Sequence, residues 1–247
     1  MNLARRALLH TAAIGCVVPI VARGRAQDRY ATARENLLRE IENDMHETSP
    51  ETGYRALSAA VRNAIATVPR ERFVPSHLTD AAYENRPLPI GDGQTISQPF
   101  IVALMTQLLQ PKASDVVLEV GTGSGYQAAV LAECVAKVYS IEIVASLAQR
   151  ARAALDAAGG RAANVVTRVG DGYLGWPEAA PFDGIMVTAA PDHVPPRLIE
   201  QLKPGGRLVI PVGPHRAGQE LLVIEAGRDG RAVARRTIAV RFVPLTR

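Results

Sequence analysis

The sequence predicts an α/β fold in which a mostly parallel, doubly wound sheet carries helices on both faces. From about residue 116 onward, short apolar runs rich in β-branched residues alternate with helical patterns, which is typical of a parallel sheet. A glycine-rich turn at 121–125 follows the first of these runs. The chain has 247 residues, of which 47% are apolar and 21% charged. It is therefore long enough for one compact domain with a well-buried core and too short for two large ones.

Two helices are expected before the sheet, at 34–46 and 55–68. In the second, Leu57, Val61 and Ile65 fall on one helical face, as an amphipathic helix requires. Pro69 is expected to end this helix, because proline cannot continue it. These are extra N-terminal helices outside the doubly wound part.

The sheet region is expected to alternate strand and helix, and to end in a pair of antiparallel strands. Strands are predicted at 115–120, 137–142, 164–170, 182–190 and 205–213, with helices at 126–135, 145–158 and 195–202. The last two apolar runs, 220–227 and 235–245, are separated by Arg228-Asp229-Gly230. This turn signal predicts an antiparallel C-terminal hairpin at one edge of the sheet.

Residues 1–26 have the features of an export signal, and 27–247 are then the single mature domain. Arg5-Arg6 precedes a mostly apolar run, and Gly24-Arg25-Ala26 forms a small-x-small cleavage site, so cleavage is expected after Ala26. The order RRALL resembles a twin-arginine signal, which predicts a periplasmic or otherwise exported protein. The apolar run is shorter than the roughly 20 residues a spanning helix needs, so no membrane span is expected. The alternative, an N-terminal tail of a cytoplasmic protein, stays open.

Composition excludes several function classes. The net charge of +4 lies in the signal-like segment, which has four arginines and no acid, so the remaining residues carry a formal charge of zero. With no basic, aromatic-bearing stretch, no nucleic-acid partner is expected. Only Cys134 remains outside the segment, in an apolar helical run, and we expect it to be a buried core thiol. The histidines lack metal-ligand spacing, so no metal is expected. The protein is also expected to be a monomer.

The glycine turn indicates a nucleoside cofactor. In a doubly wound sheet the first strand-to-helix turn lies under the ligand, and glycines there let the backbone approach it. Tyr126 stands where the dinucleotide pattern has its third glycine, which disfavours the alternative of a dinucleotide oxidoreductase. The stretch E-x-G-x-G-x-G, which begins at Glu119, resembles motif I of class I S-adenosylmethionine-dependent methyltransferases. A turn that only packs a helix close to a strand remains an alternative.

Two further acids follow the next two predicted strands. Glu142 ends the second strand, about twenty residues after the glycine turn, where a carboxylate can accept hydrogen bonds from both ribose hydroxyls. Asp171-Gly172 ends the third strand, and in methyltransferases of this architecture that position meets the adenine amino group. Because the carboxyl ends of parallel strands meet at one edge, these signals together predict a crevice that binds S-adenosylmethionine.

Six stretches resemble the protein-L-isoaspartate O-methyltransferase family, and the resemblance covers the chain from about residue 34. The segment QTISQP is the most specific of them, because many methyltransferases share the glycine motif and not this one. The resemblance implies the class I methyltransferase fold and methylation of the free α-carboxylate of L-isoaspartyl and D-aspartyl residues in damaged proteins and peptides. The ester then cyclises to a succinimide, whose hydrolysis returns some normal aspartate. The stretches lie at 68–75, 82–99, 117–132, 170–191, 202–213 and 240–246.

The resemblance also assigns site residues. Ser97 matches the family's active-site serine and is expected to orient the carboxylate, which is ionised near pH 7 and needs no general base. The alternative for Ser97 is a serine that caps its own loop. Cofactor contacts are expected at Thr95, Ile96, Glu119, Gly121, Thr122, Gly123, Gly125, Glu142, Asp171, Gly172 and Thr246. Substrate contacts are expected at Pro89, Ile90, Gly91, Val240 and Phe242. The alternative is that the two segments that hold them, 87–91 and 240–244, are ordinary edge structure.

Two other functions remain open at this stage. A class I methyltransferase with another substrate would share the cofactor floor but would lack the segment QTISQP. A non-catalytic cofactor-binding module is the alternative from a different class. Export also has a chemical difficulty, because S-adenosylmethionine is made in the cytosol and would have to be delivered.

Overall fold

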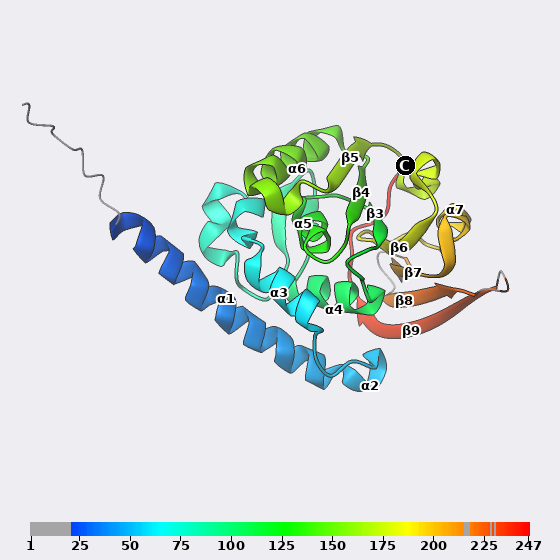
Figure 1. Cartoon of the computed structure of the whole chain (residues 1–247), viewed down its shortest axis with the longest axis horizontal. Helices are drawn as coiled ribbons and strands as arrows, with labels where there is room; N and C mark the ends of the chain where they lie inside the picture. Colours follow the sequence, from blue (N-terminus) through cyan, green and yellow to red (C-terminus); the bar gives the residue numbers. More distant parts are fainter. Residues whose placement is uncertain (1–20, 215–217, 228, 230) are drawn as a thin grey trace, which may run out of the picture.

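The fold is built on one seven-stranded sheet in the order β5-β4-β3-β6-β7-β8-β9 (Figure 1). The computed structural model describes residues 21–214, 218–227, 229 and 231–247, with the backbone alone for 21–29 and 161. Strands β3 to β7 run parallel, and β8 and β9 are antiparallel to their neighbours. The doubly wound sheet with an antiparallel C-terminal hairpin is thereby confirmed. The strands are β3 (Val116–Val120), β4 (Lys137–Glu142), β5 (Val165–Val169), β6 (Phe182–Val187), β7 (Leu202–Val212), β8 (Gln219–Ala226) and β9 (Ala232–Val240).

The strands are apolar on both faces because helical layers cover both. Val117 and Val138 enter the core on one side of the sheet, whereas Leu118 of β3 and Ile141 of β4 enter the core on the other. Helices α4, α5 and α6 contribute to the first core, and α7 contributes to the second through Leu198. The helices are α1 (Val21–Glu47), α2 (Ser49–Thr52), α3 (Ala59–Thr67), α4 (Pro99–Leu109), α5 (Tyr126–Ala132), α6 (Ala145–Ala158) and α7 (Pro196–Glu200).

Helix α4 was not expected from the sequence. Every residue of Pro99–Leu109 except Ile101 is buried. A helix that is apolar all round lacks the 3.6-residue periodicity by which an amphipathic helix is recognised. It begins at Pro99, directly after Ser97-Gln98, and it therefore holds the end of the QTISQP segment against the sheet.

The N-terminal helices differ from expectation in their bounds. Helix α1 already begins at Val21, and its first turns extend beyond the body of the molecule (Figure 1). Helix α3 begins only at Ala59, because the Ser58 hydroxyl accepts a hydrogen bond from the Val61 N–H at 3.3 Å and caps the helix. Most of the expected export signal, residues 1–20, lies outside the described residues, as do 228 and 230 of the expected hairpin turn. Within the described ranges, no helix is both long and apolar enough to cross a membrane.

A small hairpin precedes α4, in the polar, glycine-punctuated stretch 88–98, for which the sequence predicted no strands. Strand β1 (Leu88–Gly91) pairs antiparallel with β2 (Gln94–Ile96). Asp92 and Gly93 form the turn with φ of 52° and 70°, and two positive φ values match the type I′ turn that suits a hairpin. One edge of β1, which carries the expected substrate contacts Pro89, Ile90 and Gly91, is thus occupied by β2.

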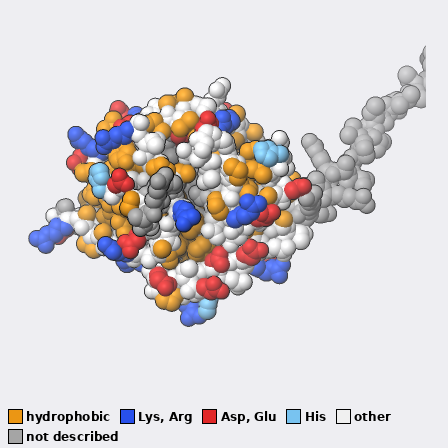
Figure 2. Space-filling model, turned by 180° about the vertical axis from the view of Figure 1, so that it is seen from behind, with side chains coloured by type: hydrophobic (Ala, Val, Ile, Leu, Met, Phe, Trp, Pro, Cys, Tyr) orange, Lys and Arg blue, Asp and Glu red, His pale blue; other side chains and the backbone are white. Residues whose placement is uncertain are grey.

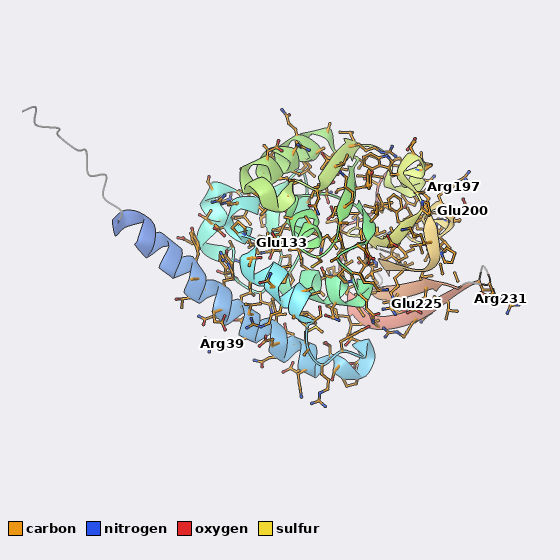
Figure 3. All side chains as sticks on the ribbon, in the orientation of Figure 1. Arg39, Glu133, Arg197, Glu200, Glu225 and Arg231 are labelled. Atoms are coloured by element: carbon orange, nitrogen blue, oxygen red, sulfur yellow. The ribbon has the colours of Figure 1, made fainter. Side chains whose placement is uncertain are left out.

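Apart from buried residues such as Arg70, Glu119 and Glu142, charged side chains lie mostly at the periphery. Figure 3 shows the labelled Arg197 and Glu200 on α7 at the outer rim, where they form an ion pair at 3.2 Å. On the face shown in Figure 2, acidic and basic side chains are interspersed. Cys134 is buried, as expected, and burial raises the pKa of its thiol to about 11. A thiol in this state is protonated at neutral pH and is not a nucleophile.

Candidate functional site

A pocket of about 780 Å³ opens at the carboxyl ends of β3, β4 and β6. Strand β3 has β4 on one side and β6 on the other, so the chain order reverses there, which is where doubly wound sheets bind ligands. Nine residues expected to bind substrate or cofactor line it: Thr95, Ile96, Ser97, Gly121, Thr122, Gly123, Glu142, Gly172 and Thr246.

The pocket floor requires glycine at two positions. Gly121 has φ of +97°, and a Cβ there would collide with the Thr188 hydroxyl, which donates to the Gly121 carbonyl at 2.6 Å. A Cβ at Gly172 would collide with the side chain of Val120. The ends of β3 and β6 and the turn after β5 therefore approach one another without side chains between them. Glycine at these two positions is thus required for the close packing of these elements, and the backbone of both residues also lines the pocket.

Glu142 holds the glycine turn in place. Its side chain is 6% exposed, and its two carboxylate oxygens accept the Gly123 N–H at 2.8 Å and the Val144 N–H at 3.0 Å. Each carboxylate oxygen has a second lone pair. Because Glu142 also lines the pocket, it can accept hydroxyl groups of a bound ribose without giving up either backbone contact.

Glu119 lies behind the glycine turn and does not line the pocket. It is fully buried, and its Oε2 accepts a hydrogen bond from the Ser140 hydroxyl, whose Oγ lies 2.6 Å from Oγ1 of Thr122. Burial raises the pKa of Glu119 to about 8, the Ser140 hydrogen bond lowers it in part, and the charge of Glu142 raises it further. The structure thus places Glu119 under Thr122 and in indirect contact with the pocket. A direct contact of Glu119 with the cofactor stays a prediction.

Asp171 and Gly125 are also outside the pocket wall. Oδ1 of Asp171 accepts the Tyr173 N–H at 2.8 Å and caps a short helical turn, while Gly172 next to it faces the pocket. Gly125 has φ of +88°, and a Cβ there would press on Leu155 of α6. Gly125 therefore lets the turn pack closely against α6, which was the alternative function considered for the whole glycine turn. Gly121 and Gly123 line the pocket.

The β1–β2 hairpin lies against the glycine turn. The Ile90 side chain is 3.7 Å from where a Cβ on Gly123 would stand. The tip of the hairpin is tied to α6, because Asp92 accepts hydrogen bonds from Arg150 at 2.7 Å and Ser146 at 3.1 Å. These bonds, the one from Arg150 first, hold the pKa of Asp92 below its usual range. The polar, glycine-punctuated segment thus folds over the cofactor floor.

A second, larger hollow adjoins the pocket at Ser97. Thr95, Ser97, Thr188 and Val243 line both spaces. The second hollow has about 1,850 Å³ of empty space, part of it open to solvent. Of the expected substrate contacts, Val240 and Phe242 line it, and Pro89, Ile90 and Gly91 line neither space.

The C-terminal segment closes the pocket on the side of β6. The Leu245 N–H donates to the Ala190 carbonyl at 2.9 Å, and the Ala190 N–H donates to the Val243 carbonyl at 2.8 Å. This pairing brings Thr246 to the pocket wall.

The sequence reasoning did not identify Thr188, Tyr126 and Val243 as site residues, nor Arg70, which is buried beside Ser97. The sequence held a signal for two of these residues, because Thr188 lies in the stretch 170–191 and Arg70 in the stretch 68–75. Both stretches carry the family resemblance.

Comparison with known proteins places this geometry in a family. Residues 41–247 match the family model described as "Protein-L-isoaspartate(D-aspartate) O-methyltransferase". A relative from Syntrophobacter fumaroxidans, named protein-L-isoaspartate O-methyltransferase 2, is 54% identical over 239 residues, which cover 97% of this chain and 94% of the relative.

Two solved structures are also similar. One, named protein-L-isoaspartate O-methyltransferase, has a TM-score of 0.75 and 29% identity, and the match covers 87% of this chain and 66% of that one. The other, a protein from Plasmodium falciparum described as a putative protein-L-isoaspartate O-methyltransferase, was solved with S-adenosyl-L-homocysteine. It has a TM-score of 0.72 and 24% identity, covers 88% of this chain and 98% of that one, and shows likeness of fold.

Proposed function

The chain belongs to the protein-L-isoaspartate (D-aspartate) O-methyltransferase family, and from that premise we propose how its own residues divide the reaction. The protein methylates isoaspartyl residues of damaged proteins and thereby starts their repair. S-adenosylmethionine supplies an electrophilic methyl group on its sulfonium. The observation that carries the assignment of roles is the junction at Ser97, where the pocket at the carboxyl ends of the strands meets a second, larger hollow.

The nucleoside is held by the floor of the pocket at the carboxyl ends of the strands. Glu142 accepts the ribose hydroxyls, the backbone of Gly121 and Gly123 lies under the nucleoside, and Gly172 leaves room for the base. Thr95, Ile96 and Thr246 surround the opposite end, next to Ser97. This division is supported by the place of these residues in the pocket wall and by the lone pairs that remain on Glu142.

Ser97 orients the carboxylate of the substrate. The nucleophile is already ionised at neutral pH, so the chain has no proton to remove. The residues around Ser97 must hold the attacking oxygen in line with the methyl group and exclude water. Positioning of this kind can lower the reaction barrier by roughly 7–11 kcal/mol in favourable cases. The hydroxyl of Ser97 donates a hydrogen bond and forms no covalent bond. Its half-buried place between the two spaces supports this role.

The peptide around the isoaspartyl residue occupies the open hollow. Val240 and Phe242 form one wall of it. The expected contacts of Pro89 and Gly91, which are exposed, would require a long substrate that reaches past the hollow over the outer face of the hairpin, whereas Ile90 is buried against the glycine turn. Binding along a wide, open hollow suits a repair enzyme, because damaged residues occur in many sequences.

We also propose that residues 1–26 are a cleaved export signal of the twin-arginine type, that 27–247 form one mature domain, and that the mature protein is a periplasmic or otherwise exported monomer. Replacing Arg5 and Arg6 with lysine tests export, because the signal depends on the arginine pair. Fractionation is expected to move the protein from the exported to the cytoplasmic fraction. A distribution that the substitution leaves unchanged contradicts the export proposal and favours a cytoplasmic enzyme.

The enzymatic proposal is tested with matched peptides. The full chain, and in parallel the chain lacking residues 1–26, is incubated with methyl-labelled S-adenosylmethionine and peptides that differ only in isoaspartate or aspartate at one position. Base-labile label on the isoaspartyl peptide alone is expected, and Ser97→Ala is expected to reduce it strongly. No label on either peptide, with cofactor binding intact, would favour a binding module or another methyl acceptor.

A further inference from the structure

Arg70 is a fully buried arginine beside the catalytic segment, and the family reaction as derived above gives it no task. It stands in the short helical turn Arg70–Phe73 and has no exposed surface. Its Nε donates to the Ala82 carbonyl at 2.9 Å, and its Nη2 donates to the Ser97 carbonyl at 2.7 Å. Its third nitrogen, Nη1, has no hydrogen-bond partner among the described residues.

The two acceptors lie at the two ends of one segment. Ala82 precedes the β1–β2 hairpin and Ser97 directly follows it, so one guanidinium joins the base of the hairpin. The same guanidinium lies 4.8 Å from the ring centroid of Tyr126, the first residue of α5 after the glycine turn. Arg70 therefore contacts, at once, the backbone of Ser97 and a side chain that lines the cofactor pocket.

Stability alone is a poor reason for this arginine. Removing a guanidinium from water is costly, and apolar residues of similar volume often replace buried charges without loss of stability. Arginine differs from lysine in its rigid planar fork, which can donate in two fixed directions. Here the fork donates hydrogen bonds to the carbonyls of Ala82 and Ser97, which lie 15 residues apart in sequence. Burial lowers the pKa of Arg70 to about 10, so it remains charged at neutral pH and its hydrogen bonds are charge-assisted.

We propose that Arg70 is a positioning residue for methyl transfer: its guanidinium fixes the backbone of Ser97 relative to Tyr126, and so fixes the distance between the substrate carboxylate and the methyl group. The proposal rests on the function assigned above to Ser97. Arg70 touches neither substrate nor cofactor, and it acts through the carbonyl of Ser97. Its effect should therefore depend on whether residue 97 has a hydroxyl to position.

The test is a double-mutant cycle on the full chain, with kcat and KM measured on the isoaspartyl peptide. Arg70→Lys retains the charge and loses the fork, so a loss that follows from geometry is expected to appear in this variant. A displacement of the order of 1 Å can cost about 100-fold in rate, so we expect kcat to fall about 10- to 100-fold. The dissociation constant of S-adenosylhomocysteine is expected to change by less than about threefold, because the floor of the pocket is unaltered.

The second arm repeats Arg70→Lys in a Ser97→Ala background. The proposal predicts that the loss in kcat shrinks there to less than about threefold, because interacting residues are not additive. Arg72→Lys is the matched control, since Arg72 lies in the same turn but donates to the Ala157 carbonyl at 3.1 Å, away from the pocket. This control is expected to keep wild-type kcat.

Each other outcome has a defined meaning. An equal loss from Arg70→Lys with and without the Ser97 hydroxyl overturns the proposal, because a merely structural role is additive. Wild-type kcat in Arg70→Lys also overturns it. An inactive parent chain contradicts the proposed function itself, whereas an active parent with additive losses contradicts only the role of Arg70.

Discussion

Gly121→Ala tests the geometry of the glycine turn directly. At Gly121 an added Cβ meets two penalties, a φ of +97° and a collision with the Thr188 hydroxyl. The left-handed conformation costs a non-glycine residue roughly 1–2 kcal/mol, part of which, about 0.4–1 kcal/mol, is offset by the lower entropy of the unfolded chain. Moving the hydroxyl away from the Gly121 carbonyl removes one hydrogen bond, about 1 kcal/mol. The expected loss of unfolding free energy is therefore about 2–3 kcal/mol, the sum of these contributions with residual steric strain.

Gly53→Ala separates the two penalties. Gly53 has φ of +80° and nothing within 4 Å of its Cβ position, so it carries the backbone cost without the collision. We expect Gly53→Ala to cost about 1 kcal/mol. In a Thr188→Ala background, Gly121→Ala should cost about 1 kcal/mol less than in the parent chain, because the colliding hydroxyl is gone.

Urea unfolding of the four single and double variants gives these differences directly, provided that the dependence on urea concentration is unchanged. The reasoning is refuted if Gly121→Ala and Gly53→Ala cost the same, or if the cost at Gly121 is the same with and without the Thr188 hydroxyl.

Three further predictions follow from the same site. The folded pKa of Glu119 is raised from 4.5 to about 8, so its contribution to stability is complete below pH 4.5 and is lost as pH rises through 8. Glu119→Gln should therefore flatten the fall in unfolding free energy between about pH 5 and 9. An unchanged slope in this variant would show that Glu119 is ionised in the folded protein. Asp92→Asn removes the exposed ion pair with Arg150, so it should leave stability nearly unchanged but speed the release of S-adenosylhomocysteine in stopped-flow experiments. An unchanged release rate would mean that the hairpin tip does not gate the pocket. Glu142→Gln places an amide NH₂ opposite a backbone N–H and should weaken S-adenosylhomocysteine binding about tenfold or more by calorimetry, whereas unaltered affinity would remove Glu142 from the ribose site.

The sheet could be predicted from the sequence because its signals are local and repeated. The strand 137–142 and the helix 145–158 have the predicted bounds, and the C-terminal strands form the predicted antiparallel pair. The position of the pocket followed as well, since the carboxyl ends of neighbouring parallel strands must meet. Glu142, Gly121 and Ser97 are brought together as expected.

What could not be predicted depends on contacts distant in sequence. Helix α4 has no amphipathic period because it is covered on all sides. The Asp92-Gly93 turn was a readable hairpin signal, but strands of four and three residues are too short to show alternation. Glu119 belongs to the motif by sequence, and only the fold reveals that it lies behind Thr122. Arg70 acts across 27 residues on a backbone carbonyl, and no pattern of side chains records such a contact.

The most direct measurement of the central claim uses one peptide that carries an isoaspartyl residue, a normal aspartate, a glutamate and a free C-terminal carboxylate. The peptide is incubated with the full chain and S-adenosylmethionine, and the methyl group is located by tandem mass spectrometry at early times. The account predicts a methyl ester on the α-carboxyl of the isoaspartyl residue alone, followed by loss of methanol and appearance of the succinimide peptide. A methyl ester on any of the other three carboxylates, or none while the cofactor is bound, would contradict it.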